Sequence, residues 1–438
     1  MKVAYLMNSY PQVSSTFIGR EIEGLERAGI EIPRFAFRRW EGALVDPRDI
    51  AEAERTDYLL DDGAARLFGG LIVEVLFHPR GLLRALGLWR KLLAARGGPF
   101  AGHFVRHAAY LLEAVALRRR LRRTPVAHVH AHFTTNTAAV AMMVRAMGGP
   151  SYSFTVHGPD ELFDPEGNSL GLKIEHAAFV ACISHFCRSQ CMIFSPPGTW
   201  DRLRIVHCGV RPDFYAGRTD PPGPARAPAG RALFVARLSR MKGGLVLIEA
   251  MARVHAMRPE AELVLIGDGD LRPLMEQRVA DLGLGKVVRF LGFRSQTEVR
   301  DAMASADMLV LPSFAEGVPV VLMEAMASGL PVIASQVAGV SELVKDGVSG
   351  FVIPPGDVET LAARMETLFG NPDLRARMGE AGAATVRADF DIDTETAWLS
   401  DLVRATATGN PLPAGLRPGS PRVSQSPLAS TLRFSVAE

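Results

Sequence analysis

The 438-residue chain lacks a long apolar run. No stretch reaches the about 18 uninterrupted apolar residues of a membrane-spanning helix, and the nearest candidate, 68-FGGLIVEVLF-77, is broken by Glu74. The N-terminal MKVAYLMNSYPQ holds only a five-residue apolar run, which is too short for a secretory signal and typical of a first strand. The sequence therefore predicts neither a membrane span nor an export signal.

Lysine and cysteine are both scarce. Six of the 49 basic residues are lysines, at positions 2, 91, 173, 242, 286 and 345. Three of the four cysteines form the cluster 182-CISHFCRSQC-191, which lacks the C-x2-C pairs of structural zinc sites. Disulfides are not expected without export. We therefore predict buried free thiols, including Cys208, in a cytoplasmic protein.

The formal net charge of +2 gives the whole chain no general attraction for nucleic acid. The charge is nevertheless uneven, because residues 76–123 hold eleven bases and one acid, Glu113. Leucines and Trp89 alternate with bases in 81-GLLRALGLWRKLLAARG-97. A basic amphipathic helix is typical of peripheral docking on the cytoplasmic face of a membrane. The alternative is an ordinary domain helix whose leucines face the core.

Short β-rich runs alternate with helical patterns along most of the chain. Most runs are continuously apolar, as in strands covered on both faces of a parallel sheet. This pattern predicts an α/β chain with two doubly wound, Rossmann-like domains that face each other across a cleft. The expected strands lie at 2–7, 126–131, 152–156, 178–183, 204–206, 232–236, 262–267, 287–290, 307–311, 331–335 and 351–353.

Proline and glycine mark the domain boundaries. We expect an N-terminal domain over 1–217, a Pro- and Gly-rich linker over 218–230 and a C-terminal domain over 231–385. A last helix at about 386–406 should pack back on the first domain. Residues 407–438 are rich in Pro, Ser and Gly, which favours a disordered tail.

Two glutamates flank an uncharged stretch in 314-FAEGVPVVLMEAMASGLPVIAS-335. A strand and a loop come before it, and proline and glycine bound the expected helix. The helix N-terminus, with the amides of Gly317 and Val318, would form an anion seat in the cleft. Glu316 would lie at that seat and Glu324 inside the helix. The alternative is a pair of solvated glutamates without a ligand.

Two further motifs follow strands of the second domain. In 237-RLSRMKGG-244, Arg237 and Lys242 precede a glycine-rich helix start, which suits a diphosphate, although a solvated basic loop is the alternative. In 262-ELVLIGDGDLRPLM-275, Gly267 and Gly269 resemble part of a dinucleotide fingerprint. Arginine replaces its third glycine, so nucleotide binding without NAD fits better.

The first domain offers polar side chains to the same cleft. His157 follows a strand in 153-SFTVHGPDEL-162 and can hydrogen-bond a sugar hydroxyl or a carbonyl. Ser14, Ser15 and Thr16, after the first strand, suit either helix N-caps or ligand contacts.

Three imidazoles share one strand face in 128-HVHAH-132. No carboxylate lies near His128, His130 and His132 in the sequence, and their spacing along a strand is too wide to share one ion easily. We therefore expect packing or substrate contact for His132, and no metal.

Together these segments resemble the GT-B glycosyltransferases of glycosyltransferase family 4, which are retaining enzymes that use nucleotide sugars. They are most similar to bacterial exopolysaccharide enzymes of the colanic-acid type. The resemblance extends to about residue 405 and is carried by eight segments in the expected order, namely 10–25, 128–138, 154–162, 206–210, 235–244, 265–275, 315–335 and 339–357.

The resemblance implies a role for each candidate residue. Arg237 and Lys242 would hold the donor diphosphate, Glu324 would bind the ribose, and Glu316 and His157 would lie beside the transferred sugar. The implied reaction moves a hexose from a nucleotide sugar, UDP-hexose ahead of GDP-mannose, to a saccharide acceptor. Membrane docking would make that acceptor lipid-linked.

No cofactor and no essential metal are expected, because the two cations and the helix N-terminus can stabilise the leaving diphosphate. Two other functions stay open on the sequence alone. One is a two-Rossmann-domain NAD-dependent oxidoreductase, and the other is a non-catalytic protein that binds nucleotide sugars.

Two positions depart from the family pattern. The first loop has Ser14–Ser15 where the family has a serine–glutamate pair, which removes a carboxylate expected near the acceptor. The late motif 338-AGVSE-342 keeps Glu342 but has Ala338 and Ser341 in place of the family residues.

Overall fold

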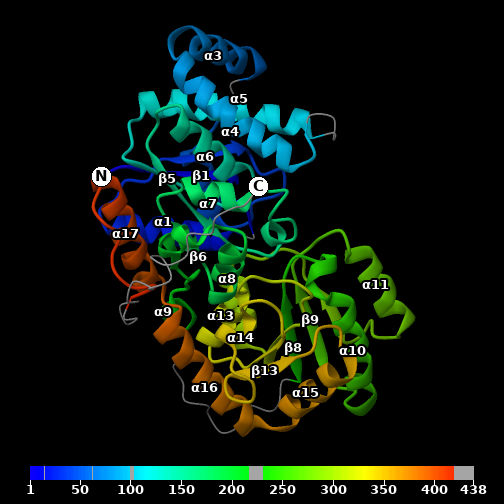
Figure 1. The fold of residues 1–438 in the computed structure, drawn as a ribbon. Coiled ribbons are helices and arrows are strands. Elements are labelled where there is room, and N and C mark those ends of the chain that lie inside the picture. Colours follow the sequence, from blue (N-terminus) through cyan, green and yellow to red (C-terminus); the bar gives the residue numbers. More distant parts are fainter. Residues whose placement is uncertain (14, 62, 99–102, 217–229, 419–438) are drawn as a thin grey trace, which may run out of the picture.

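The computed structural model describes residues 1–13, 15–61, 63–98, 103–216 and 230–418. Ser14, nearly all of the predicted linker and the last part of the predicted tail lie outside the described residues. Two α/β domains stack on each other (Figure 1), each around its own parallel sheet. The predicted fold class is confirmed.

The front domain contains a seven-stranded sheet with the order β3-β2-β1-β4-β5-β6-β7. Every neighbouring pair is parallel. The strands are β1 (Val3–Ser9), β2 (Arg34–Arg38), β3 (Thr56–Tyr58), β4 (His128–His132), β5 (Ser151–Val156), β6 (Val180–Cys182) and β7 (Leu203–Ile205).

The rear domain contains a six-stranded parallel sheet with the order β10-β9-β8-β11-β12-β13. Its strands are almost wholly buried, as continuous apolar runs require when helices cover both faces. They are β8 (Arg231–Val235), β9 (Glu262–Ile266), β10 (Val288–Phe290), β11 (Met308–Leu311), β12 (Val332–Ser335) and β13 (Gly350–Ile353).

Helices connect the strands and cover both sheets. In the front domain they are α1 (Thr16–Arg27), α2 (Pro47–Arg55), α3 (Gly63–Phe77), α4 (Pro79–Ala95), α5 (Phe104–Arg123), α6 (Asn136–Ala146), α7 (Leu170–His176), α8 (His185–Ile193) and α9 (Pro212–Tyr215). The others are α10 (Gly244–Met257), α11 (Arg272–Asp281), α12 (Gln296–Ala304), α13 (Val320–Ala327), α14 (Val340–Leu343), α15 (Val358–Gly370), α16 (Pro372–Asp389) and α17 (Ile392–Thr408).

Strand order reverses between β1 and β4 in the front sheet and between β8 and β11 in the rear sheet. In open parallel sheets, ligands bind beyond the carboxyl ends of the strands at such a reversal. The loops after these four strands carry most of the predicted site residues. The topology therefore brings the candidate site to the place where the two domains meet.

The sequence analysis missed two strands of the front sheet. In β2, arginines stand at both ends of a buried Phe-Ala-Phe core, so the strand has no long apolar run. In β3, only three residues pair with β2. Both strands owe their conformation to pairing across the sheet rather than to local sequence, which is why a pattern search overlooks them.

The chain crosses between the domains a second time near its C-terminus. The predicted last helix is in fact two helices, because α16 packs on α13 of the rear domain and α17 on α1 of the front domain. Asp391 caps α17 by accepting from the amides of residues 393 and 394. At the crossing, Val210 exchanges backbone hydrogen bonds with Phe390 (3.0 Å) and Ile392 (2.9 Å).

The predicted tail begins later than expected. The structure describes residues 407–418 and places Leu416 against the edge of the front sheet, where its carbonyl accepts from the Ile205 amide at 2.9 Å. Arg417 donates to Glu395 of α17 at 3.3 Å. These contacts order the first part of a segment that composition alone assigned to disorder.

The basic helix predicted to lie on a membrane is α4, and several of its leucines face the interior, whereas Leu83 is exposed. Leu82, Leu92 and Leu93 are buried, and α4 packs against α5 and α6. The ordinary domain-helix alternative therefore describes these three leucines, and membrane docking of the basic segment stays a prediction.

One residue of the rear domain has an unfavourable backbone conformation. Ala338, where the family pattern has another residue, has a φ of +44°, in the left-handed region that favours glycine. We expect Ala338→Gly to raise the free energy of unfolding by about 1 kcal/mol. Urea unfolding of both proteins measures the difference. Ala363→Gly, on the exposed side of α15, is the control and should instead lower it by about 1 kcal/mol.

Candidate active site

Lys242 and Glu316 form an ion pair at the carboxyl end of the rear sheet. Lys242 lies in the loop after β8, and its Nζ is 2.7 Å from Glu316 Oε1. Ser313 donates its hydroxyl to the same oxygen at 2.7 Å. Glu316 is buried, whereas about a quarter of the Lys242 side chain is exposed. The structure therefore brings together the two residues assigned to the diphosphate and to the sugar. Arg237 is exposed in the same loop.

Gly267 and Gly269 pack directly on that loop. A Cβ on Gly267 would lie 2.0 Å from the Ala236 carbonyl oxygen, and one on Gly269 would lie 2.4 Å from the Leu238 oxygen. The two glycines therefore allow close backbone approach between the loops after β8 and β9. This packing role differs from the donor contact that the sequence predicts for them.

Helix α13 begins one residue later than predicted, with Pro319 at its N-cap position. Glu324 is buried on this helix, and its Oε1 accepts from Tyr215 Oη at 2.9 Å and from Arg20 Nη2 at 2.5 Å. Burial lowers the pKa of Arg20, but Glu324, Tyr215 and Glu23 together raise it more, so the pKa lies above its usual value. The glutamate predicted to bind ribose thus pairs with a cation of the other domain.

His157 of the front domain faces the loop of the rear domain that contains Glu316 and Gly317. Its carbonyl oxygen would lie 2.1 Å from a Cβ on Gly317, so only glycine allows this approach. Glu161 holds the His157 backbone by accepting from its amide at 2.6 Å. Burial, and then His132, lower the pKa of His157 well below its usual value. The imidazole is therefore neutral and can accept or donate a hydrogen bond. Val318 is buried beside this contact.

Glu342, retained in the late motif, also joins the domains. Its two carboxylate oxygens accept from the amides of His185 and Phe186 at the start of α8, both at 2.8 Å. A carboxylate at a helix N-terminus satisfies unpaired amides and complements the helix dipole. The residue therefore fixes the first turn of a front-domain helix from the rear domain.

The three histidines of β4 form a polar ladder inside the front domain. All three are fully buried, and the ring nitrogens of His128 and His130 contact hydroxyls of the neighbouring strand β5. His130, for example, contacts Ser153 at 2.7 Å and Thr155 at 2.8 Å. His132 Nδ1 lies 3.1 Å from His157 Nε2, which connects the ladder to the cleft. Packing, one of the two roles expected for His132, is thus what its contacts show.

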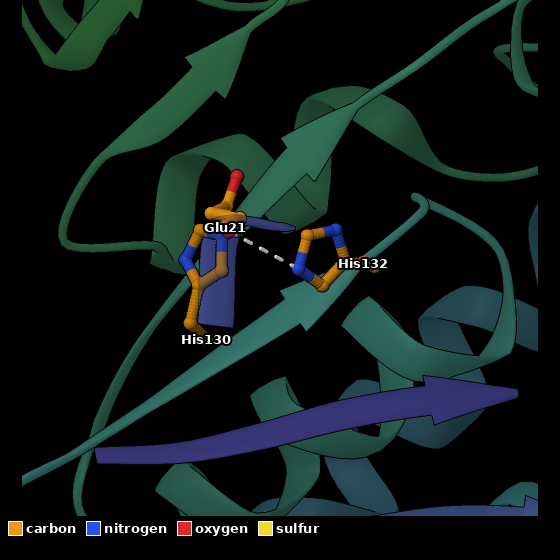
Figure 2. A group of neighbouring side chains, drawn as sticks. All are labelled: Glu21, His130 and His132. Atoms are coloured by element: carbon orange, nitrogen blue, oxygen red, sulfur yellow. Dashed lines mark ion pairs between the residues drawn. The ribbon is translucent and has the colours of Figure 1, made fainter. Parts of the chain in front are cut away.

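A carboxylate lies beside this ladder, contrary to the sequence prediction. Glu21 of α1 is 3.4 Å from His132 Nε2 (Figure 2). It also accepts from Tyr5 Oη at 2.5 Å. Burial raises the pKa of Glu21, but His132 and then His130 lower it more, to about 2. The folded chain brings this residue close although more than a hundred positions separate it from the histidines.

Glu21, His130 and His132 offer one carboxylate and two imidazoles, which are common zinc ligands. Their ligand atoms lie within 4.8 Å of one another. Both ring nitrogens of His130 already contact hydroxyls, and Glu21 already accepts from Tyr5 and pairs with His132. We therefore interpret the group as a hydrogen-bonded network that orients His132, and through it His157.

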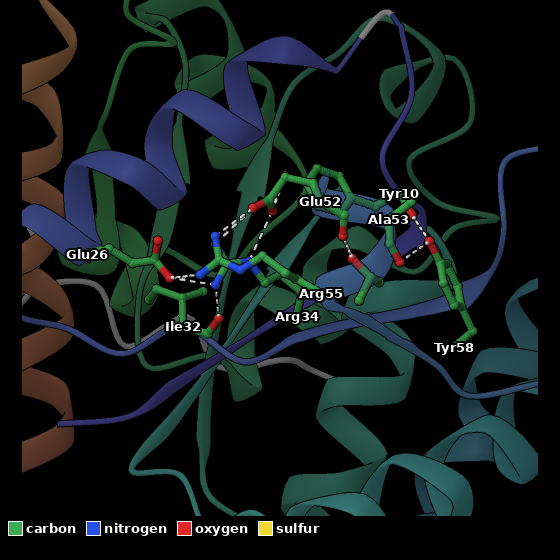
Figure 3. Close-up of polar contacts among 9 residues, drawn as sticks. Tyr10, Glu26, Ile32, Arg34, Glu52, Ala53, Arg55 and Tyr58 are labelled. Carbon is green, nitrogen blue, oxygen red and sulfur yellow. Dashed lines mark hydrogen bonds and ion pairs between the residues drawn. The ribbon is translucent and has the colours of Figure 1, made fainter. Parts of the chain in front are cut away.

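A buried network fixes the loop between β1 and α1 (Figure 3). Arg34 of β2 pairs with Glu26 of α1 at 2.5 Å and with Glu52 of α2 at 3.0 Å. Tyr10, in the loop, donates to Glu52 at 2.9 Å and accepts at its carbonyl from Tyr58 at 3.0 Å. Loop, helices and sheet edge therefore form one rigid unit.

The hydroxyl cluster at the start of α1 is described for two of its three residues. Ser15 is buried at the N-cap position but makes no side-chain capping bond, so its predicted capping role is wrong. Thr16 begins the helix, and Phe17 stacks against His157 with ring centroids 4.8 Å apart. The first turn of α1 therefore lies beside the cleft.

The predicted free thiols are confirmed for all four cysteines, which are buried and unbridged. Cys182 and Cys191 approach to 3.9 Å between their sulfur atoms. The fourth, Cys208, lies 3.6 Å from His157 Nδ1. The cluster therefore belongs to the core of the front domain.

The chain is 40% identical over 431 residues to the amylovoran biosynthesis glycosyltransferase AmsK of Erwinia amylovora, an alignment that covers 90% of this chain and 96% of that protein. The chain belongs to the glycosyltransferase group 1 family. The family model, described as glycosyl transferases group 1, matches residues 225–385, which comprise most of the rear domain. The enzyme is therefore a glycosyltransferase, and the oxidoreductase alternative is excluded.

Solved structures share the fold of this glycosyltransferase. A sucrose-phosphate synthase from Thermosynechococcus elongatus has a TM-score of 0.70 at 20% identity, with 94% of this chain and 100% of that chain covered. Anabaena Alr3699/HepE in complex with UDP and glucose has a TM-score of 0.70 at 19% identity, with 92% and 100% covered. The architecture is GT-B, as predicted.

Sequence reasoning missed Arg20, Glu21 and Tyr215 in the site of this glycosyltransferase. Arg20 and Glu21 lie within the quoted segment 10–25, where charged residues stand between the apolar positions Ile18, Ile22 and Leu25 of α1. These charged residues are the signal available in the sequence. Their partners lie far along the chain, so only the fold identifies them.

The buried histidine ladder gives stability a measurable pH dependence. Burial, and then His130, lower the pKa of His128 to about 3, so it stays neutral in the folded chain while the unfolded chain takes up a proton below pH of about 6.5. Its contribution to stability is complete above that value and declines toward pH of about 3. Glu161 changes stability with pH in the opposite direction. Burial raises its pKa to about 7, so its contribution to stability declines as the pH rises toward that value.

A comparison of wild type with His128→Asn separates the contribution of His128 from that of Glu161. We expect the gap in unfolding free energy between wild type and variant to shrink by about 1 kcal/mol between pH of about 6 and 5. Denaturant unfolding at the two pH values measures the gap. The exposed His185→Asn is the control, and an equal pH effect in both variants would contradict the assignment.

Proposed function

We propose that this enzyme is a retaining glycosyltransferase of family 4 that transfers a hexose from a nucleotide sugar to a saccharide acceptor. UDP-hexose is the favoured donor, and GDP-mannose is the alternative. The observation that carries the proposal is the Lys242–Glu316 pair beside the N-terminus of α13, with His157 of the other domain in backbone contact with the same loop.

The rear domain supplies the charges that a nucleoside diphosphate needs. Lys242 is partly exposed, and Arg237 lies in the same loop. In the free enzyme, Glu316 neutralises Lys242. A donor diphosphate would offer Lys242 a second anion, while the amide end of α13 adds positive potential without a mobile charge.

Glu324 is suited to bind ribose without losing its partner. Arg20 and Tyr215 both contact Oε1, so we assign Oε2 to the ribose hydroxyls. A carboxylate held by a cation is an acceptor of fixed position, which is what a pair of hydroxyl donors requires. Arg20 and Tyr215 are then positioning residues rather than contacts of the donor.

Catalysis follows from the charge that develops on the leaving diphosphate. Lys242, Arg237 and the α13 N-terminus stabilise that charge as the bond to the sugar breaks. The acceptor hydroxyl attacks from the same face, and the leaving phosphate takes its proton, which retains the anomeric configuration. Neutral His157, whose ring nitrogens contact His132 and Cys208 in the free enzyme, would exchange one of these contacts for a hydrogen bond to the sugar. Glu316 would stabilise positive charge on the ring. No metal is required in this scheme.

The names of related proteins are the basis for the proposed acceptor. AmsK carries the name of an amylovoran biosynthesis enzyme, and a lipopolysaccharide core biosynthesis glycosyltransferase of Rhizobium meliloti is 30% identical over 225 residues. We propose synthesis of an exopolysaccharide or surface glycan, with a lipid-linked saccharide as acceptor at the cytoplasmic face of the membrane. HepE, whose structures hold UDP or UDP-glucose, supports the choice of a uridine donor.

A screen of nucleotide sugars for donor hydrolysis tests the donor assignment. We expect one UDP-hexose to be hydrolysed fastest, and Lys242→Ala and Glu324→Ala each to lower kcat/KM by about a hundredfold or more, or about 3 kcal/mol of transition-state stabilisation. Glu324→Ala should act mainly on KM if it removes ribose binding, whereas Lys242→Ala should act on kcat.

Two variants complete the donor screen. Tyr215→Phe removes one hydrogen bond to Glu324 and should have a smaller effect than Glu324→Ala. Lys286→Ala, in the loop before β10, is the matched control outside the cleft and should leave turnover unchanged. Undiminished hydrolysis in both Lys242→Ala and Glu324→Ala would disprove the site.

Removal of divalent metal tests the charge scheme. Because side chains and a helix N-terminus neutralise the diphosphate in this proposal, EDTA should leave the rate unchanged within about twofold. Turnover before and after EDTA treatment, followed by magnesium or manganese addition, is the measurement. Loss of activity that an added metal restores would show that the cations are insufficient.

A further inference from the structure

The solvent-facing side of α3 is apolar, the reverse of an ordinary surface helix. Five of its large apolar side chains are more than half exposed: Phe68 (56%), Ile72 (59%), Val75 (51%), Leu76 (66%) and Phe77 (70%). Figure 1 shows α3 at the end of the front domain that points away from the rear domain. Water-exposed apolar area of this kind is unfavourable unless another surface covers it.

The acidic residue of this helix, Glu74, points inward. Glu74 is fully buried, and its carboxylate pairs with Arg118 and, at 3.2 Å, with Arg122, both on α5. His78 Nδ1 is 3.8 Å away. These contacts lock α3 onto α5 with its apolar side outward. The exposure is therefore built into the packing of the helix pair.

The surface around α3 is positively charged. Residues 63–123 contain twelve bases and two acids, Glu74 and Glu113, and both acids are buried. Exposed Arg80 and Arg84 follow the apolar stretch on α4, next to exposed Leu83. The described helices α3, α4 and α5 thus present bases and apolar side chains, and no exposed acid, to solvent.

A cavity between α3 and α5 concentrates this charge. It encloses about 300 Å³ and is lined by four arginines, Arg66, Arg119, Arg120 and Arg123, together with Leu67 and Val115. Arg119 donates to the Arg66 carbonyl at 2.8 Å, which joins the two helices at the cavity. One of the four, Arg120, also pairs with Asp57 of β3 at 2.9 Å, so the cluster keeps a net positive charge. Such a guanidinium cluster suits a phosphate group.

We propose that α3 lies in the interface of a bilayer that contains anionic phospholipid, with a lipid headgroup phosphate in the arginine cavity. The apolar side chains would enter the acyl region while Arg66, Arg80 and Arg84 meet headgroups. Across the described residues, no helix combines enough length with enough apolar character to cross a bilayer. The proposed contact is peripheral: α3 supplies its apolar part, and Arg80 and Arg84 at the start of α4 supply charge.

A bilayer explains the charge better than a second copy of this chain does. A symmetric contact through α3 would place the same basic surface on both sides of the interface, where like charges repel. An anionic bilayer covers the apolar side chains and neutralises the bases at once. The inference bears on the lipid-linked acceptor of the proposed function but does not depend on the donor chemistry.

Vesicle flotation tests the proposal. The full chain is mixed with phosphatidylcholine vesicles with and without phosphatidylglycerol, at low and high salt. We expect binding to the anionic vesicles that weakens with salt. Ile72→Glu/Leu76→Glu should lower binding at least tenfold, because both positions are exposed and accept glutamate without disturbing the fold. Met257→Glu/Leu274→Glu, at exposed sites of α10 and α11, is the control and should bind like wild type.

A second pair of variants tests the cavity. Arg66→Gln/Arg123→Gln should reduce the preference for anionic vesicles, whereas Arg387→Gln, at an exposed position of α16, should keep it. Equal flotation of wild type and Ile72→Glu/Leu76→Glu would overturn the proposal. So would a wild-type dimer in light scattering that this variant dissociates, because a second copy would then cover α3.

Donor hydrolysis without vesicles separates this proposal from the proposed function. We expect Ile72→Glu/Leu76→Glu to hydrolyse the donor at the wild-type rate, because α3 lies in the front domain away from the cleft. Failure of flotation with intact hydrolysis would reject the membrane contact alone. Flotation with no hydrolysis of any nucleotide sugar would reject the donor assignment alone.

Discussion

The Arg20–Glu324 ion pair is the contact on which the arrangement of this glycosyltransferase depends. It joins α1 of the front domain to α13 of the rear domain at 2.5 Å, and both side chains are nearly buried. Loss of one partner from a buried pair leaves an uncompensated charge and costs about 3–5 kcal/mol. Here that cost would fall on the domain contact and on the position of Glu324 together.

Other contacts support this pair from both sides. The histidine ladder and Glu21 hold the front-domain strand that leads to the cleft, and Arg34 fixes the loop before α1. Glu342 of the rear domain caps α8 of the front domain. The cleft is thus lined by groups whose positions are set before any ligand arrives, which is the condition for stabilising charge in a transition state.

The sequence was sufficient for the fold class, and two of the site residues that it predicts lie in contact in the structure. Continuous apolar strands predict parallel sheets, and motifs at strand ends predict where chemistry gathers. Lys242 and Glu316 are accordingly found in contact. Arg20 and Glu21 were not predicted, because a buried charge is recognised by its partner, and Glu324 is 304 positions away from Arg20. Strands β2 and β3 were missed because pairing, rather than local propensity, defines them.

Apolar patterning also misled at one place. In α4, alternating leucines and bases suggested an interfacial helix, but Leu82, Leu92 and Leu93 are buried. In α3, a continuous apolar run with one glutamate gave no amphipathic signal, yet the glutamate faces inward and the apolar side faces solvent. Glu74 points inward because it pairs with arginines of α5. The sequence of α3 alone does not reveal that contact.

The most direct test of the central claim is a crystal structure of the enzyme with UDP. The account predicts a diphosphate oxygen within hydrogen-bond distance of Lys242 Nζ, and the ribose hydroxyls on Glu324 with Arg20 still on its other oxygen. A nucleotide bound outside the cleft, or one that displaces Arg20 from Glu324, would contradict it.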